Sequence, residues 1–306
     1  MAVSNLRRSA ARVFNALLAG DPVELLTRVT LLIFFIGPNL IGLEWHYKLL
    51  FQVVAVLGLA APRIGRSGPF WCAVAGLMLF KTLDHWWMQD NHVFLLTWWC
   101  LTLALAGFAA DPDRVIAGNS RLLIGLSFFF AVVWKGLLSP DYMGGDYFHY
   151  TFLTDDRFAK LGTLFCEMDF GQLQSNYRAV NALTDYTKDI TSVQLQGTAT
   201  LRTLAIVVTW WTVIIEGILA VLFLLPPQWR ISRVRNAALL IFAWTTYLAA
   251  PVTTFGWTLL TLGLAQCSPE ARKTRLCYLL TYPLLLLYEI APIWPALEEF
   301  AAWWKK

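Results

Sequence analysis

The stretch between residues 202 and 226 reads RTLAIVVTWWTVIIEGILAVLFLLP, and Glu216 is its only charged residue after the first position. A helix of about 20 mainly apolar residues is long enough to cross the hydrocarbon core of a bilayer. A helix that is apolar on every face lies either in a membrane or in the core of a large protein, and core helices are usually shorter. We therefore predict that residues 202–226 form a transmembrane helix.

The composition of the whole chain supports a membrane protein. Of the 306 residues, 58% are hydrophobic and only 14% are charged, whereas soluble domains carry about 25% charged residues. The 15 Trp residues also suit membrane interfaces. The net charge of +4 comes from short basic clusters beside apolar runs, which is typical of cytoplasmic loops. We expect the lipid bilayer as a partner and no nucleic acid.

Eight more apolar segments accompany the first, and together they predict an all-α, polytopic transmembrane helical bundle. The nine candidate spans are residues 24–43, 46–62, 67–88, 92–110, 117–138, 202–226, 236–250, 252–267 and 275–295. The seventh and eighth are short and flank Pro251, so they could be one kinked helix or a broken pair. The bundle therefore has eight or nine spans.

The distribution of basic residues favours nine spans. The positive-inside rule places loops rich in Lys and Arg on the cytoplasmic side. With a cytoplasmic N-terminus, the basic residues at 63–66, at 114 and at 230–235 obey the rule. Those at 272–275 obey it only if residues 236–267 cross the membrane twice. We expect a multi-pass protein of the cell membrane with its N-terminus in the cytoplasm and its C-terminus outside.

Two segments lie outside the predicted spans. Residues 1–20 place apolar side chains on one helical face and arginines elsewhere, which predicts an amphipathic helix on the cytoplasmic membrane surface. Residues 139–201, including Asp141 and Tyr142, are net acidic and rich in Asn and Gln. They predict an external polar loop within one membrane domain, residues 21–306. The length of this loop favours a lid or binding segment, and a passive connection is the simpler alternative.

Ionisable residues within the spans suggest functional sites, because burying them in a bilayer is costly. Lys81, Asp84 and His85 share one helix face through their i, i+3 and i+4 spacing. They could form a polar network or only a self-neutralising ion pair. Asn91 and His92 follow at the turn into the next span. The Asn suits a helix start, while a neutral imidazole there could move protons or orient a substrate.

Lys135 and Glu216 stand out most among these residues. Lys135 lies near the outer end of its span in apolar surroundings. Desolvation favours its neutral amine, which can act as a general base; the alternative is a lysine that reaches the interface. Glu216 has no charged neighbour in sequence and needs a partner from another helix. The candidates are Lys135, Arg121, Lys81 and Arg28.

No metal site is expected, because the four His residues lack paired ligand spacing. The five Cys residues show no CxxC motif, and four lie in or beside apolar runs, so we interpret them as inert membrane cysteines.

Three of these features occur together in a known family. Residues 90–96 look like its Asn-His motif at the start of a helix. Residues 129–145 resemble its aromatic-rich helix that ends in a lysine and leads into a turn with Pro, Asp and Gly, and Arg121 lies upstream where the family often has a basic residue. Residues 211–226 resemble its apolar helix with a Glu. Over roughly residues 20–295, the chain resembles the horizontally transferred transmembrane domain (HTTM) family, which includes vitamin K-dependent gamma-glutamyl carboxylases.

The resemblance implies a carboxylase-like enzyme that acts on an external, secreted peptide. In carboxylases of the family, a lysine deprotonates reduced vitamin K, and O2 then converts the quinol into a stronger base. This base takes a proton from the gamma carbon of a glutamate, to which CO2 adds. Carried to this sequence, the base is Lys135, with His92 and Asn91 as the other motif residues and vitamin K or another quinol as the cofactor.

Two other functions remain open from the sequence. Short bacterial members of the family resemble the SdpB group, which assists the maturation of secreted peptide toxins. A non-carboxylating accessory protein for the maturation or export of a secreted peptide is therefore one alternative. A transporter is the other, because broken helices and buried charges are typical of transporter binding sites.

Overall fold

The computed structural model describes residues 20–40, 44–84, 86, 89, 91–155, 158–183, 191–249 and 252–290. Every regular element in these ranges is helical, as the sequence predicts. The predicted amphipathic helix at residues 1–20 lies outside the described residues except for Gly20, and His85 also lies outside them.

The helices follow one another along the whole described chain. They are α2 (Pro22–Leu40), α3 (Trp45–Ala60), α4 (Pro62–Gly65), α5 (Gly68–Asp84), α6 (Asn91–Phe108), α7 (Pro112–Val133), the π-helical turn η2 (Trp134–Leu138), α8 (Pro140–Met143), α9 (Asp146–Thr154), α10 (Ala159–Phe165), α11 (Phe170–Leu183), α12 (Ala199–Leu224), the 3-10 turn η4 (Arg230–Val234), α13 (Arg235–Ala249), α14 (Thr253–Ala265) and α15 (Arg272–Ile290).

Three of these helices are long and apolar enough to cross a membrane: α6, α7 continued through η2, and α12. The 27 residues from α7 through η2 extend about 40 Å at 1.5 Å per residue. Only 17% of the most apolar stretch of this helix is buried inside the protein, and Phe130, Trp134 and Leu137 point their side chains outward. Exposed apolar surface of this extent favours a lipid environment.

Each of the nine apolar segments coincides with a helix whose bounds differ by only a few residues. The two segments that flank Pro251 form separate helices, α13 and α14. Gln266 just after α14 donates a hydrogen bond to Asn236 at the start of α13, so the two helices run antiparallel. The segment is therefore a broken pair, although Pro251 itself lies outside the described residues.

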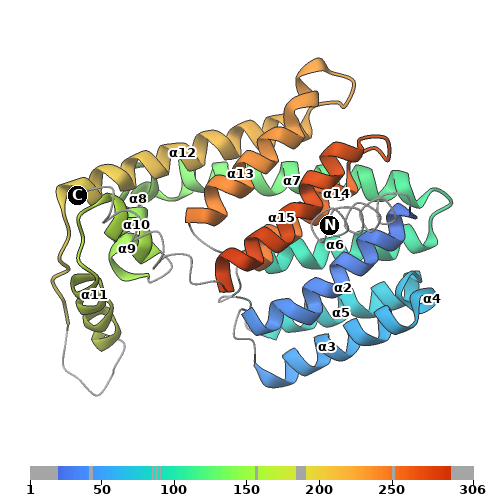
Figure 1. Ribbon diagram of the computed structural model, residues 1–306, viewed down its shortest axis with the longest axis horizontal. Helices are drawn as coiled ribbons and strands as arrows, with labels where there is room; N and C mark the ends of the chain where they lie inside the picture. Colours follow the sequence, from blue (N-terminus) through green and yellow to red (C-terminus); the bar gives the residue numbers. More distant parts are fainter. Residues whose placement is uncertain are drawn as a thin grey trace, which may run out of the picture.

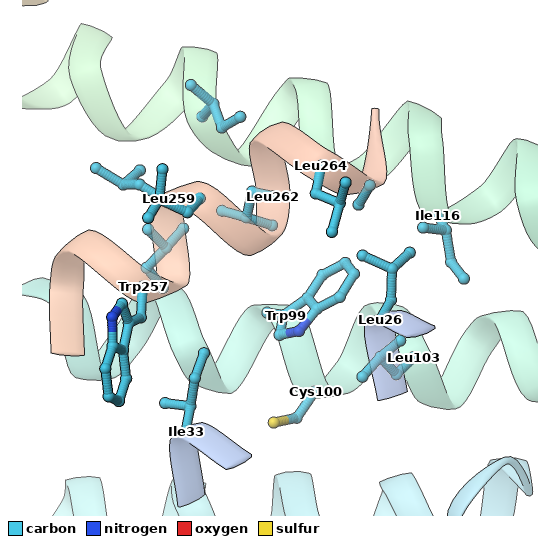
Figure 2. Close-up of a cluster of buried hydrophobic side chains, with 14 of the residues drawn as sticks. Leu26, Ile33, Trp99, Cys100, Leu103, Ile116, Trp257, Leu259, Leu262 and Leu264 are labelled. Carbon is cyan, nitrogen blue, oxygen red and sulfur yellow. The ribbon is translucent and has the colours of Figure 1, made fainter. Parts of the chain in front are cut away.

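The main hydrophobic core surrounds α14. Every residue from Thr253 to Ala265 is buried except Phe255, as expected for a helix that neighbouring helices enclose. Figure 2 shows Leu262 and Leu264 of this helix facing Trp99 of α6. Trp99 is fully buried, and its indole Nε1 donates to Oγ1 of Thr30 in α2 at 2.8 Å. This bond satisfies the one polar atom that the ring brings into the core.

The described residues between 139 and 198 form a small helical cap, where the sequence predicts an external polar loop. Helices α8 to α11 enclose a second hydrophobic core that includes Phe148, Phe152 and Leu173. The sequence did not predict these helices, because the overall composition of the segment is polar, but four of its aromatic residues (Tyr142, Phe148, Phe152 and Phe158) lie in this core. Figure 1 shows the cap at one end of the molecule, beside the first turns of α12.

Polar contacts hold the cap together and attach it to α12. The Asn176 side chain donates to the Gln196 carbonyl at 2.8 Å and accepts from the Gln196 N–H at 2.9 Å. Arg202 of α12 donates to Asp146 of α9 at 2.5 Å and to the Gly144 carbonyl at 3.1 Å. The amide-rich character of this segment thus has a partly structural explanation.

Candidate functional site

The most distinctive polar contact in the described chain joins α12 to the end of α7. Nζ of Lys135 lies 2.5 Å from Oε1 of Glu216. The Lys135 side chain is 18% exposed and the Glu216 side chain is 7% exposed. A carboxylate this deeply buried needs a counter-charge. Of the four candidate partners for Glu216, the structure selects Lys135.

Lys135 is positioned by a local departure from α-helical geometry. The regular helix α7 ends at Val133, and residues Trp134–Leu138 form the π-helical turn η2. Single π-helical turns are rare and often mark functional sites, because they redirect side chains relative to the regular helix. The turn ends at Leu138, and after Ser139 helix α8 of the cap begins at Pro140. Lys135 therefore lies at the junction between the main bundle and the cap.

Tyr142 of the cap lies against the Lys135–Glu216 pair. Its ring centroid lies 5.2 Å from Nζ of Lys135, a distance at which an ammonium group is attracted to an aromatic face. The side chain is only 5% exposed, and its hydroxyl lies close to Thr212. Burial and the nearby Glu216 carboxylate raise the pKa of Tyr142. Its hydroxyl thus stays protonated at neutral pH.

Tyr247 of α13 is a member of this site that the sequence did not indicate. It is buried and close enough to Glu216 to interact with it electrostatically. Its hydroxyl and Oε2 of Glu216 both lack a hydrogen-bond partner among the described residues. Buried polar atoms are nearly always satisfied, and exceptions call for a functional or solvent explanation. A tyrosine that ends an apolar segment beside Pro251 was the only sequence signal.

The residues predicted around His92 form a second, separate group. Lys81 and His92 line a cavity of about 50 Å³ together with Thr254 and Thr258, which is room for a water molecule or two. Lys81 also donates to Gln89. Asp84 accepts a hydrogen bond from the Tyr47 hydroxyl at 2.8 Å, and Asn91 is exposed at the start of α6.

Aromatic rings connect the two groups. The His92 and Phe255 ring centroids are 5.9 Å apart, and those of Phe255 and Tyr247 are 6.2 Å apart. Tyr247 in turn interacts with Glu216. No hydrogen bond or ion pair joins Lys135 to His92 in the described part of the chain. The resemblance-based catalytic residues are therefore linked through packing and not through direct contact.

Comparisons of the chain with protein-family models, with curated proteins and with solved structures find no match. The geometry of the Lys135–Glu216 pair is thus the main guide to its chemistry. A buried acid and base in contact can hold or release one proton between them, and the surrounding protein sets which group carries it.

Two other predicted residues lie away from this pair. Arg121 lies in the first half of α7, about 14 residues before Lys135, and lines a cavity there. Asp141 is exposed in the first turn of α8, beside the buried Tyr142. Arg28, once a candidate partner for Glu216, pairs with Glu24. Several charged residues have apolar neighbours in the sequence, so hydropathy alone does not show which of them pairs with Glu216. The packing of the helices decides which residues are partners.

Proposed function

We propose that the protein is a multi-pass membrane protein of the HTTM type whose Lys135–Glu216 pair accepts a proton from a lipid-soluble substrate that bears an acidic hydroxyl, such as a reduced quinone. The observation that carries this proposal is the contact between a buried carboxylate and a partly exposed lysine at the end of an apolar helix.

The surroundings of the pair suit a substrate that arrives from the membrane. Trp134, Leu137 and Leu138 are exposed around Lys135, and Trp211 is exposed on α12. A lipid-soluble ring could lie against these side chains and present its hydroxyl to the partly exposed amine.

The residues of the site also fit the chemistry that a quinol requires. When bound, a reduced quinone supplies an acidic hydroxyl and the electrons for a reaction with O2. Lys135 can pass a proton from Nζ to Oε1 of Glu216 across 2.5 Å, which leaves a neutral amine. That amine can then take a proton from a hydroxyl on its exposed side. The hydroxyl of Tyr247, which has no other partner among the described residues, is available to stabilise the protonated carboxyl of Glu216.

We further propose that the cap faces an external, secreted peptide, the substrate to which CO2 would be added. The cap touches the pair directly through Tyr142, so a peptide that binds the cap would lie near the reacting group. Asp141 and Tyr142 are adjacent in α8, and the exposed Asp141 is available for such a contact.

The proposed topology has nine spans, a cytoplasmic N-terminus and an extracytoplasmic C-terminus and cap. It is supported by the positions of the connections between helices, several of which lie together at the end of the bundle opposite the cap. A cavity at that end is lined by residues from the start of α2, the first half of α7, the start of α13 and the end of α14. Figure 1 shows the α12–α13 and α14–α15 connections at that end, away from the cap. The predicted basic loops are therefore together on one side.

The test is incubation of the purified protein with reduced quinone, O2, labelled bicarbonate and a secreted peptide from a neighbouring gene. Label should enter the peptide with the wild type and with Lys273→Ala, a control lysine that is exposed at the start of α15. It should not enter with Lys135→Ala, although that variant should still insert into membranes. Full labelling by Lys135→Ala would remove the assignment of Lys135 as base.

A non-carboxylating accessory protein is the second candidate, and the closed ion pair favours it. Lys135 is neutralised by Glu216 and shielded by Tyr142, an arrangement that could serve only to fasten the cap to the bundle. In the same experiment, bound quinone without label in the peptide would favour this function. Absence of quinone binding would overturn the quinol-dependent proposal.

A further inference from the structure

A large cavity lies at the end of the bundle opposite the cap. Its volume is about 540 Å³, and it is lined by residues from the starts of α2, α7 and α13 and from the end of α14. Polar members of the lining include Arg114, Arg121, Arg235 and Gln266, while Leu26 and Ile116 contribute apolar surface. Cavities of roughly 300–1,000 Å³ are the usual size for small-molecule sites.

Positive charge in and beside this cavity is not neutralised. Arg121 and Arg235 are close enough to repel each other electrostatically. Arg275, 2% exposed, lies beside the wall, where it interacts with Cys267. Within the described residues no ion pair involves these three arginines. Asp113 also lines the cavity, but it is exposed.

Individual nitrogen atoms of three arginines here are buried without a hydrogen-bond acceptor, although only Arg275 is buried as a whole residue and Arg121 and Arg235 are half-buried. Nε of Arg121, Nη1 of Arg235, and Nε and Nη1 of Arg275 have no partner among the described residues. An uncompensated charge of this kind destabilises a fold strongly. Three of them around one cavity indicate that a negatively charged group is needed to complete it.

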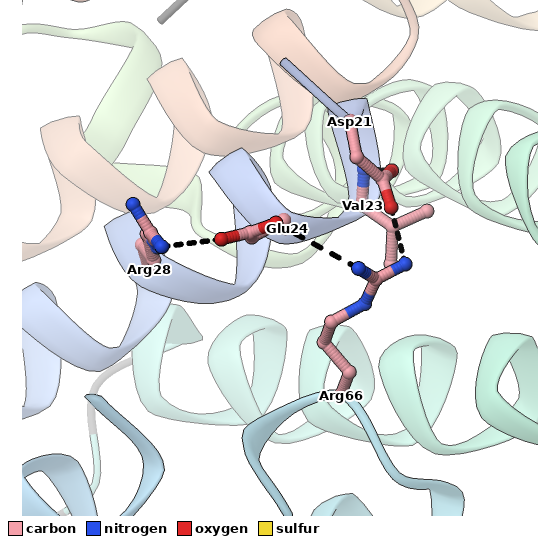
Figure 3. A network of polar contacts seen from close by, with 5 residues as sticks. All are labelled: Asp21, Val23, Glu24, Arg28 and Arg66. Atoms are coloured by element: carbon pink, nitrogen blue, oxygen red, sulfur yellow. Dashed lines mark hydrogen bonds and ion pairs between the residues drawn. The ribbon is translucent and has the colours of Figure 1, made fainter. Parts of the chain in front are cut away.

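Other arginines at this end of the bundle have acidic partners. Figure 3 shows Arg66 held by Asp21 and Glu24, and Arg28 paired with the same Glu24. A general excess of basic residues on the cytoplasmic side therefore does not explain the cavity, since its arginines have no such acids. Residues 1–19, which precede α2, contain no Asp or Glu and add three more arginines.

We propose that this cavity binds a phosphate-bearing anion through Arg121 and Arg235, which line it, with Arg275 adding positive charge beside the wall. The planar guanidinium group matches phosphate oxygens with paired hydrogen bonds and keeps its charge when buried. The phosphate could belong to an anionic lipid headgroup, which the position of the cavity between helices suits, or to a soluble compound. This inference is independent of the proposed quinol chemistry at Lys135.

The test measures thermal unfolding of the full chain purified in a neutral detergent. Pyrophosphate is added in one arm, and in the other the protein is placed in nanodiscs of phosphatidylglycerol or of phosphatidylcholine. Stabilisation by pyrophosphate alone would indicate a soluble ligand, and stabilisation only by phosphatidylglycerol would indicate a headgroup. No stabilisation in either arm overturns the proposal.

Variants separate this site from general electrostatics. Arg121→Gln should weaken binding of the effective probe about tenfold or more, because it removes a charge-assisted contact. In the absence of anions the same variant should unfold at a higher temperature than the wild type, because it relieves repulsion with Arg235. Arg63→Gln removes the same charge from an exposed residue at this end and should do neither. Equal weakening by both variants would contradict a defined site.

Discussion

Nζ of Lys135 and Oε1 of Glu216 lie 2.5 Å apart although 81 residues separate them in the chain. The contact joins the π-helical end of α7 to the middle of α12, and the 60 residues of the cap lie between the two helices in sequence. Because Tyr142 of the cap rests its ring against the same ammonium group, one lysine connects both helices and the cap.

Removing only one partner of this pair should be more damaging than removing both. Lys135→Met leaves Glu216 buried without a counter-charge and should lower the free energy of unfolding by about 3 kcal/mol, the lower end for buried pairs because Lys135 is partly exposed. Lys135→Met combined with Glu216→Leu should recover most of the loss. Unfolding in detergent, followed by Trp fluorescence, measures both. Additive losses in the double variant would show that the two residues do not interact.

The close approach of α5 and α6 should depend on the absence of a side chain at Gly107. A Cβ at Gly107 would lie 2.4 Å from the backbone N of Gly68, and backbone atoms cannot move aside cheaply. Gly107→Ala should therefore separate the helices and lower the melting temperature. The control is Gly76→Ala in α5, where nothing lies within 4 Å of the added Cβ, and it should gain up to about 1 kcal/mol from helix propensity. Similar melting temperatures for the two variants would contradict this packing.

The cap should loosen when Asn176 is lost. Asn176→Ala leaves the Gln196 N–H and carbonyl without their partners, at a cost of about 0.5–1.5 kcal/mol for each of these part-buried hydrogen bonds. The expected result is faster proteolysis between residues 184 and 198 in otherwise intact protein. Ser175→Ala, at the exposed neighbouring position, should cleave at the wild-type rate. An unchanged rate for Asn176→Ala would mean that these bonds do not limit opening of the cap.

Acid should weaken the cap through His149. Burial and the charge of Arg202 lower the pKa of His149, and Asp146 opposes them only partly. The folded cap therefore binds this proton less well than the unfolded chain, so His149 stabilises it fully above the unfolded pKa of about 6.5. That stability is lost as the pH falls below this value. Hydrogen exchange of α9 should accelerate from pH 7.5 to pH 5.5, after correction for intrinsic rates, and less so in His149→Gln. Equal acceleration in both proteins would assign the effect to other groups.

The nine-span topology predicts opposite labelling of two engineered cysteines. Ser175→Cys in the cap should react with a membrane-impermeant maleimide added to intact cells. Glu270→Cys in the α14–α15 connection should react only after the cells are lysed. Both positions are exposed, so access to the reagent and not burial decides the outcome. Labelling of Glu270→Cys in intact cells would overturn the assignment of that end to the cytoplasm.

Apolar runs were sufficient to locate the long helices, because helix length and burial follow directly from hydropathy. Helix α12, for example, spans Ala199–Leu224, against a prediction of residues 202–226. The cap was missed because its helices are short and its mean character is polar. Phe148 and Phe152, four residues apart and both in the second core, were the available signal for α9.

The site was predictable only in part, because partners come from distant helices. Lys135 and Glu216 could be recognised from the sequence as charged residues in apolar segments. Four possible partners for the Glu216 carboxylate nevertheless remained. Tyr247 and the unpartnered oxygen of Glu216 could be recognised only after α13 was packed beside α12. Among the arginines of the cavity opposite the cap, the sequence singled out Arg121, but as a possible partner for Glu216 and not as part of an anion site, because a lack of acidic neighbours is a property of three-dimensional packing.

The long separation of Lys135 and Glu216 also affects how the protein is made. At about 5–20 residues per second, a ribosome takes roughly 4–16 s after Lys135 to add the 81 residues that end with Glu216. In the proposed topology, α7 enters the membrane during that time with an ammonium group that has no counter-ion. Lys135 tolerates this because it stands near a helix end, where a long side chain can reach the headgroups. Glu216 lies in the middle of its helix, where its side chain cannot reach the headgroups, so it needs a counter-charge as soon as its helix inserts. Synthesis therefore delivers first the charge that can be accommodated alone, and the carboxylate arrives when its partner is already in place.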